Sequence, residues 1–271
     1  TTVSATVGTI NGISNATGSV ELIVDGGAGP VALPMTAGPT PGSFTAEIPS
    51  FPCGAEVTWY VSARAPSGVQ STFPASAPAR PFVSFIGESV TTARYDDMQA
   101  ANGWQGDLPG DTAPRGQWTR QRPLGTDAEP NGGFPVNGRQ CWFTGQGVVA
   151  NNTEADVDQG FTTLLSPVLD LTGMDYPVVE YYRWFSNVFG QNDPDDAFEV
   201  FISNDAGATW VELETVGPLG PGTNGGWNRA AFLVPEFVVA TDQIQLRFVA
   251  SDTGLPNIVE AAIDEFRVYD V

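Results

Sequence analysis

The stretch SVELIVDGG, residues 19–27, indicates the fold class of this chain. Its first seven residues alternate between polar and apolar side chains, as in a β-strand with one buried face, and the glycine pair that follows is typical of a hairpin turn. The run PVALPM at 30–35 fits the returning strand. Proline or glycine bounds two further runs, SFTAEI at 43–48 and VTWYVSARA at 57–65. Residues 1–88 therefore predict a small immunoglobulin-like or fibronectin-III-like sandwich.

The remaining residues show the same rhythm over a longer stretch. Turn-forming Gly and Pro separate short runs rich in Val, Ile, Phe, Thr and Tyr, and we find no helical stripe. Residues 72–81 contain several prolines and predict an extended edge or a stiff linker. Residues 105–138 predict an ordered loop system held by Trp104 and Trp118, with disorder as the alternative. Residues 89–271 are predicted to form a larger antiparallel jelly-roll sandwich. Its expected strands are 162–168, 178–185, 197–203, 209–215, 229–234, 243–250 and 260–268.

The residue types that are missing exclude most catalytic machinery. The 271 residues include no His, and all 11 basic residues are Arg. The chain thus has no imidazole base, no Ser-His-Asp or Cys-His arrangement, no His-ligated zinc, and no lysine for a Schiff base or a phosphate loop. Paired carboxylates for a glycosidase remain, but with 31 acidic residues some pair would meet the required spacing by chance. We expect a protein that is not an enzyme.

The charge and hydropathy of the chain restrict its partners and its location. A formal net charge of −20 argues against nucleic acid and against anionic membrane surfaces. The sequence contains no apolar run long enough for membrane insertion and no signal peptide, so we expect Thr1 to be a processed or trimmed N-terminus. A secreted or cell-surface location is predicted. The oligomeric state stays open.

The chain has two cysteines, Cys53 and Cys141. In an exported protein two cysteines more often form a disulfide than remain free thiols. A bond between them would join the two predicted modules and restrain the hinge. The alternative is two separately buried thiols.

The second part contains a series of motifs in a fixed order. The motifs are YDDMQAANGW (95–104), QCWFTG (140–145), EADVDQGFTTLLSPVLDLTG (154–173), VEYYRWFSN (179–187), DPDDAFEVFISNDAGATWVELETVG (193–217), GGW (225–227) and LRFVASDTGLPNIVEAAIDEFRV (246–268). This series is similar to jelly-roll modules of the MAM or galactose-binding-like type, which follow the catalytic domain in secreted zinc carboxypeptidases. Residues 20–65 resemble the fibronectin-III-like module of large exported bacterial proteins. The resemblance implies a non-catalytic accessory or binding module from a larger secreted protein, with a peptidase-like parent.

The same resemblance implies a structural calcium ion between the first and last strands. Residues 97–99 match the family's opening Asp-Phe-Glu, and residues 263–265 match its closing Ile-Asp-Asp. Alternation places Asp97 and Gln99 on one face of the opening strand, and the resemblance implies Asp264 as the partner ligand. Gln99 keeps one oxygen ligand where the family has a carboxylate, so the site loses a charge.

Two other acidic clusters are weaker calcium candidates. Asp193, Asp195 and Asp196 lie in a Pro-containing turn, and Asp156 and Asp158 are spaced to face one side. Of these, Asp196, Asp156 and Asp158 are the predicted ligands. Neither cluster matches an EF-hand loop, so acids in solvated turns are the alternative.

Two other functions remain open beside the accessory module. A carbohydrate-binding module would use exposed aromatic rings, and we name Tyr182 and Trp184, which share one face of a predicted strand, together with Trp118. The alternative is that these rings fill the core and its loop cover. A subunit of a surface layer or filament would show calcium-dependent assembly. The expected partner is a glycan or a component of the extracellular matrix or cell surface.

Overall fold

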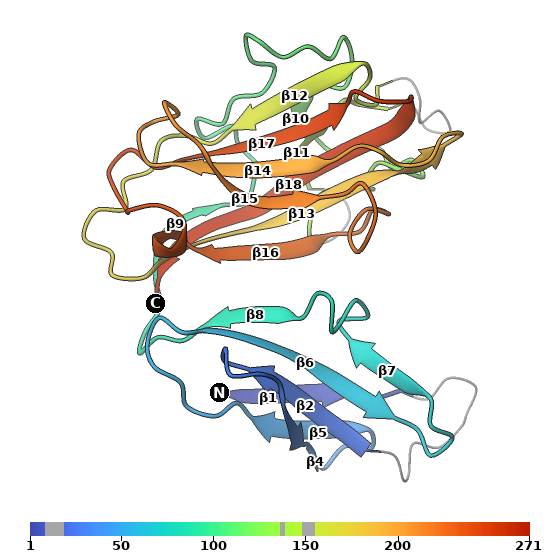
Figure 1. The fold of residues 1–271 in the computed structure, drawn as a ribbon, viewed down its shortest axis with the longest axis vertical. Helices are drawn as coiled ribbons and strands as arrows, with labels where there is room; N and C mark the ends of the chain where they lie inside the picture. The colour runs from blue at the N-terminus through green and yellow to red at the C-terminus, as the bar shows by residue number, and fades with distance from the viewer. Residues whose placement is uncertain (9–18, 136–138, 148–154) are drawn as a thin grey trace. The chain divides into compact units, whose positions relative to one another are not determined.

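The computed structural model describes residues 1–8, 19–135, 139–147 and 155–271. These residues fold into two compact units, one of residues 1–89 with Val271 and one of residues 90–270. The described residues form antiparallel strands and a single short 3-10 helix, Val234–Glu236 (Figure 1). The predicted all-β class is confirmed. The boundary predicted after residue 88 lies one residue from this division.

The first unit is a sandwich of two sheets. Its central pair is the one that alternation predicts: Leu22 is opposite Val61 in the antiparallel ladder, and both are buried in the core with Val24 and Val57. In one sheet the order is β1 (Thr2–Thr6), β5 (Ser43–Glu47) and β4 (Thr36–Ala37). The other sheet contains β3 (Val31–Pro34), β2 (Ser19–Asp25), β6 (Glu56–Arg64) and β7 (Gln70–Phe73), and β8 (Phe82–Phe85) pairs with β6.

The second unit has one large and one small antiparallel sheet (Figure 1). The large sheet has the order β10 (Trp118–Gln121), β11 (Cys141–Thr144), β18 (Asn257–Asp270), β13 (Pro177–Gly190) and β16 (Asn228–Leu233), and β9 (Thr91–Asp96) pairs with β18. The small sheet has the order β12 (Gly160–Leu165), β17 (Gln245–Asp252), β14 (Phe198–Ser203) and β15 (Val211–Val216).

The core of the second unit follows from alternation along its strands. Phe198 on β14 and Phe248 on β17 are fully buried, and Tyr181 and Phe185 on β13 belong to the same core cluster. Burying one such side chain stabilises the fold by about 1.5–3 kcal/mol. One charged side chain, Arg183, shares this inward face of β13, and its Nε donates to a carboxylate of β15 at 2.8 Å.

The long loop after β9 is ordered where it is described, as predicted. Trp104 is 4% exposed and its Nε1 donates to Asp96 at 3.0 Å. Trp118 is 3% exposed and donates to the carbonyl oxygen of Thr162 at 3.2 Å. Residues 136–138 of the predicted loop lie outside the described residues. These tryptophans hold the loops beside β10, where a groove opens.

Candidate functional site: a polar groove along β10

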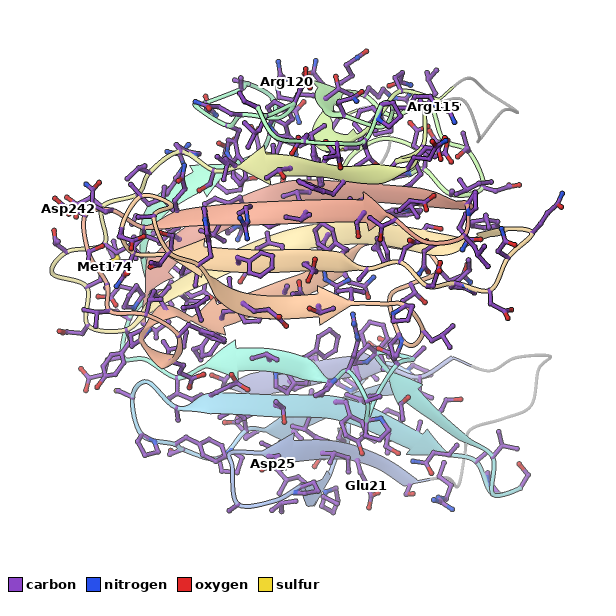
Figure 2. The ribbon with its side chains drawn as sticks, turned by 45° about the horizontal axis from the view of Figure 1, so that its top comes forward. Glu21, Asp25, Arg115, Arg120, Met174 and Asp242 are labelled. Carbon is purple, nitrogen blue, oxygen red and sulfur yellow. The ribbon has the colours of Figure 1, made fainter. Side chains whose placement is uncertain are left out.

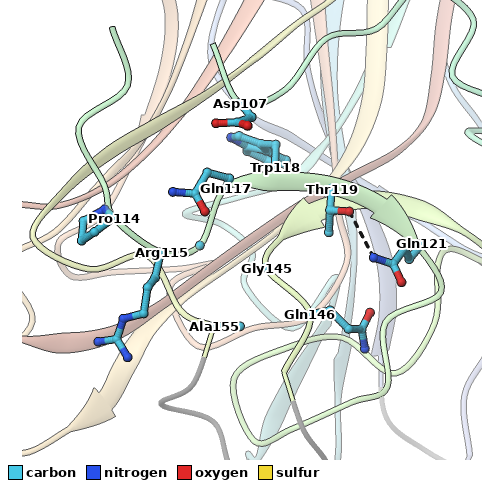
Figure 3. Close-up of a pocket in the computed structure, with 11 residues that line it drawn as sticks. Asp107, Pro114, Arg115, Gln117, Trp118, Thr119, Gln121, Gly145, Gln146 and Ala155 are labelled. Carbon is cyan, nitrogen blue, oxygen red and sulfur yellow. Dashed lines mark hydrogen bonds between the residues drawn. The ribbon is translucent and has the colours of Figure 1, made fainter. Parts of the chain in front are cut away.

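An open groove of about 470 Å³ runs along β10 in the second unit (Figure 3). β10 is at the end of the order of its sheet, so one side of this strand is not covered by a neighbouring strand. Gln117, Thr119 and Gln121 line the groove and alternate along the chain, and Gln146 lines it from the segment after β11. These four residues give the groove uncharged hydrogen-bonding side chains.

Hydrogen bonds and close backbone approaches fix the position of these side chains. The amide of Gln117 donates to the carbonyl oxygen of Ala113 at 2.6 Å. The amide of Gln121 donates to the hydroxyl of Thr119 at 3.2 Å, the bond drawn in Figure 3. At Gly145, φ is +61° and a Cβ would collide with the carbonyl oxygen of a facing residue, so only glycine lets the two loop segments come this close.

Gln146 has the most distinctive environment in the groove. Its amide nitrogen and oxygen are both buried and have no hydrogen-bond partner among the described residues. Leaving such a group unpaired costs about 1–3 kcal/mol, so a rotation of the side chain that turns the amide toward a polar molecule bound in the groove would be favoured. Sequence reasoning missed Gln146. It also did not use the alternation of Gln117, Thr119 and Gln121, which could have indicated one polar face along this segment.

The charges at the groove are few and partly neutralised. Asp107 is the one carboxylate among the described lining residues. Arg115 also lines the groove and forms an ion pair with Asp158. Figure 2 labels Arg115 together with Arg120, which is on β10 itself. Arg120 donates to the backbone carbonyl of Gln99 at 3.0 Å and so holds the preceding loop.

Tyr182 and Trp184, which were predicted to bind a sugar, are partly covered by the protein itself. Tyr182 stacks on Phe134 with ring centroids 3.8 Å apart. Trp184 donates its Nε1 to the carbonyl oxygen of Ala128 at 2.7 Å and meets Trp227 edge-on at 6.0 Å. Both rings lie on the outward side of β13, as alternation predicts, but the loop before β11 and the Gly-Gly-Trp segment pack over them. These rings therefore do not form a fully exposed platform, and sugar binding by them stays a prediction.

Trp118 also needs a correction. It lines the groove, yet only 3% of it is exposed because it is the inward-facing residue at the start of β10. Its ring belongs to the core cluster, where it meets Phe198 at 6.4 Å. It supports the groove and has no open ring face for stacking.

Asp97 and Gln99 were predicted to lie on the opening strand, but β9 ends at Asp96, and the two residues make protein contacts in the bend that follows. Asp97 forms an ion pair with Arg139 at 2.8 Å. The side chain of Gln99 donates to the carbonyl oxygen of Gln140 at 2.9 Å and accepts from its backbone N–H at 3.2 Å. The structure therefore brings Asp97 and Gln99 together at residues 139–140.

Asp264 shares no hydrogen-bond partner with Asp97 or Gln99 among the described residues. It is fully buried, and its carboxylate accepts from the N–H groups of Phe134 and Glu265, each at 2.8 Å. Burial is the main reason that the pKa of Asp264 is raised to about 7, and the nearby guanidinium of Arg139 offsets part of this effect. Among the described residues, no three Asp, Glu or Cys side chains are grouped to hold a metal ion. Calcium at this place stays a prediction.

The other predicted calcium ligands are more buried than solvated turn acids. Asp156 and Asp196 are 5% and 3% exposed, and burial raises the pKa of each to about 6. Asp158 is 8% exposed and is bound to Arg115. Asp196 lies beside Asp252, which sequence reasoning missed because the two are far apart in the chain.

Both cysteines are free in the structure. Cys53 is exposed, and Cys141 is fully buried beside Phe143 and Ala262. Burial raises the pKa of the Cys141 thiol well above its usual value. The expected bond between Cys53 and Cys141 is therefore not shown, and it stays a prediction.

No protein-family model and no curated protein matches the chain. Among solved structures, the K1 cleaved adhesin domain of Lys-gingipain from Porphyromonas gingivalis W83 is similar with a TM-score of 0.42 and 16% identity, over 66% of this chain and 97% of that one. A structure described as carbohydrate-binding modules from the β-sandwich superfamily gives 0.39 and 11%, over 94% and 87%. A cyclase from Fischerella sp. TAU gives 0.36 and 12%, over 67% and 97%. At these scores and identities the similar structures do not indicate a ligand for this chain. Any inference about a ligand therefore depends on the residues of the chain itself.

Proposed function

We propose that the second unit is a non-catalytic carbohydrate-binding module that takes a glycan in the groove along β10. The observation that carries this proposal is the buried, unpartnered amide of Gln146. It lies in a groove that is also lined by Gln117, Thr119 and Gln121. Each sugar hydroxyl both donates and accepts a hydrogen bond. Side-chain amides offer a donor and an acceptor in one group and therefore match hydroxyls in pairs.

The open form of the groove fits a chain-like ligand. A volume of about 470 Å³ along an uncovered edge strand can receive a few sugar units of a longer polymer. Affinity would come from hydrogen bonds more than from ring stacking, because Trp118 has no open ring face. We therefore expect modest affinity for a single short oligosaccharide.

The lining argues against hydrolysis of the bound glycan. A glycosidase needs two carboxyl groups about 5–10 Å apart on either side of the scissile bond. Asp107 is the one carboxylate that lines the described part of the groove. The chain has no His that could act in place of a second catalytic carboxylate. Binding without turnover is the activity that this residue set supports.

The setting of the module follows from the same proposal. A glycan ligand fits a secreted or cell-surface protein, with the module as an accessory part of a larger chain. A peptidase-like parent rests on the motif resemblance alone, and no specific contact favours a surface-layer subunit. In the parts of the chain that the structure describes, no helix is long and apolar enough to cross a membrane.

Affinity electrophoresis tests this function with xylan, mannan, mixed-linkage β-glucan and soluble chitin in the gel. The full chain should be retarded by at least one of these polysaccharides, and Gln146→Ala should abolish the retardation. Gln243→Ala is the matched control, since this exposed glutamine lies outside the groove lining. Unretarded migration of the wild-type protein in all four gels, or equal retardation of the Gln146 and Gln243 variants, would contradict the proposal.

A further inference from the structure

At one end of its core, the second unit has buried side chains that carry oxygen atoms. This end of the core, formed by Asp196, Asp252, Asn187 and Asn257, is called the rim below. On β14 and β17, Phe198 is paired with Ala250, and both point into the core. Continuing this antiparallel register by two residues places Asp196 opposite Asp252, on the same inward side. These residues are 3% and 2% exposed. Two carboxylates therefore close the end of the small sheet.

The large sheet contributes two amides to the same rim. Asn257 precedes the buried Val259 by two positions on β18, and Asn187 follows the buried Phe185 by two positions on β13. Both amides are buried: Asn257 is 5% exposed, and Asn187, in the irregular pairing of β13 with β18 after Ser186, is 0% exposed.

Hydrogen bonds show that the four side chains are neighbours. The Nδ2 of Asn187 donates to the backbone carbonyl of Asp196 at 3.0 Å. The backbone N–H of Asn257 donates to the Oδ2 of Asp252 at 3.3 Å. The Nδ2 of Asn257 also donates to the carbonyl oxygen of Asp193 at 3.2 Å. The amide nitrogens are thus engaged by the turn after β13, which fixes the orientation of the amide oxygens.

Three oxygen atoms of this group are left without a partner. They are buried and accept no hydrogen bond from any described residue. These atoms are Oδ2 of Asp196, Oδ1 of Asn187 and Oδ1 of Asn257. The ion pairs formed by the described arginines do not include Asp196 or Asp252. Buried carboxylates without a counter-charge are costly, so a cation at this rim would compensate the charges of Asp196 and Asp252.

We propose that these four side chains bind one calcium ion. Ca²⁺ takes six to eight oxygen ligands in flexible geometry, and two carboxylates with two amide oxygens are donors of the kind it prefers. Backbone carbonyls or water complete the coordination. The set contains no nitrogen or sulfur donor, so zinc is disfavoured, and its amides suit calcium better than the small, strictly octahedral Mg²⁺.

The bound ion would tie two turns together. Residues 191–197 connect β13 to β14, and residues 253–256 connect β17 to β18. Holding these turns through one ion stabilises the native state in proportion to occupancy. This site is independent of the groove along β10, because the groove lining includes none of the four ligands.

Titration of the chelator-treated full chain with CaCl2, by calorimetry and by thermal unfolding, tests the site. The wild-type protein should bind calcium and melt at a higher temperature with it. Asp196→Asn and Asp252→Asn should each weaken this binding about tenfold or more, because each removes a charged ligand. Asp97→Asn is the matched control, and it should bind this ion as the wild type does.

The two Asn variants also report on folding. Each removes a buried charge and keeps the shape of the side chain, so in chelator each should melt at or above the wild-type temperature. The proposal is overturned if the wild type binds no calcium, or if both variants bind it as tightly as the wild type. Loss of calcium binding in Asp97→Asn alone would move the ion to the opening strand and would equally overturn it.

Discussion

The buried carboxyl of Asp264 predicts that the metal-free protein loses stability as the pH rises. Its pKa is raised from 3.8 to about 7, with burial as the largest cause. A group whose pKa is higher in the folded state binds its proton more tightly there. It therefore contributes stability that is full below the unfolded-state pKa and is lost as the pH rises through the folded-state value.

The expected size follows from the shift in pKa. Each pKa unit corresponds to about 1.4 kcal/mol, so the rise to about 7 is equivalent to about 4 kcal/mol over the whole range. Between pH 5 and pH 8 the change occurs mostly below pH 7, so Asp264 alone should lower the free energy of unfolding by about 3 kcal/mol. The raised pKa values of Asp156 and Asp196, each about 6, act in the same direction.

Urea unfolding in metal-free buffer at pH 5 and pH 8, followed by tryptophan fluorescence, measures this difference. Six of the seven tryptophans belong to residues 90–270, so the signal reports mainly on the second unit. Asp264→Asn should reduce the pH dependence, whereas Asp242→Asn, at an exposed acid labelled in Figure 2, should retain it. Equal or greater stability at pH 8 than at pH 5 would refute the reasoning.

Three further predictions concern single side chains. Arg183→Met should destabilise the second unit by about 3–5 kcal/mol in urea, because it leaves Glu214 without its partner in a mostly buried pair, and an effect below about 1 kcal/mol would contradict this. Gly145→Ala should cost about 1–3 kcal/mol, from positive φ and the collision at the groove wall, while Ala substitution at the open Gly110 should cost less. In native protein a thiol reagent should label Cys53 at once and Cys141 only after unfolding. If unfolded, unreduced protein has no free thiol, the two cysteines form a disulfide and this prediction is wrong.

Strand positions were predictable where local patterns are strong. The run 19–25 matches β2 residue for residue, and the predicted strands of the second part correspond to β12 through β18 within a few positions. Alternation with one buried face is a local property, so the sequence carries it. The opening strand was expected to include Asp97 and Gln99, but β9 ends at Asp96. The short strands β10 and β11 were missed because long-range pairing with β18 or with each other creates them.

The candidate sites were less predictable for the same reason. Asp97 and Gln99 were named from their local spacing, but the guanidinium of Arg139 that bonds Asp97 comes from 42 positions away. The rim that holds Asp196 needed Asp252 from another strand, which only the register of β14 on β17 reveals. Whether Tyr182 was exposed depended on Phe134, a residue of a loop without any strand pattern. Side-chain cover of this kind is decided by tertiary packing.

The measurement that tests the central claim most directly is isothermal titration of oligosaccharides cut from whichever of the four polysaccharides retains the protein. Each lost amide contact is worth about 1–1.5 kcal/mol, so the double variant Gln121→Ala, Gln146→Ala should bind about 100-fold more weakly than the wild type. The Gln243→Ala variant should bind as the wild type does. An unchanged Kd in the double variant would contradict a glycan site along β10.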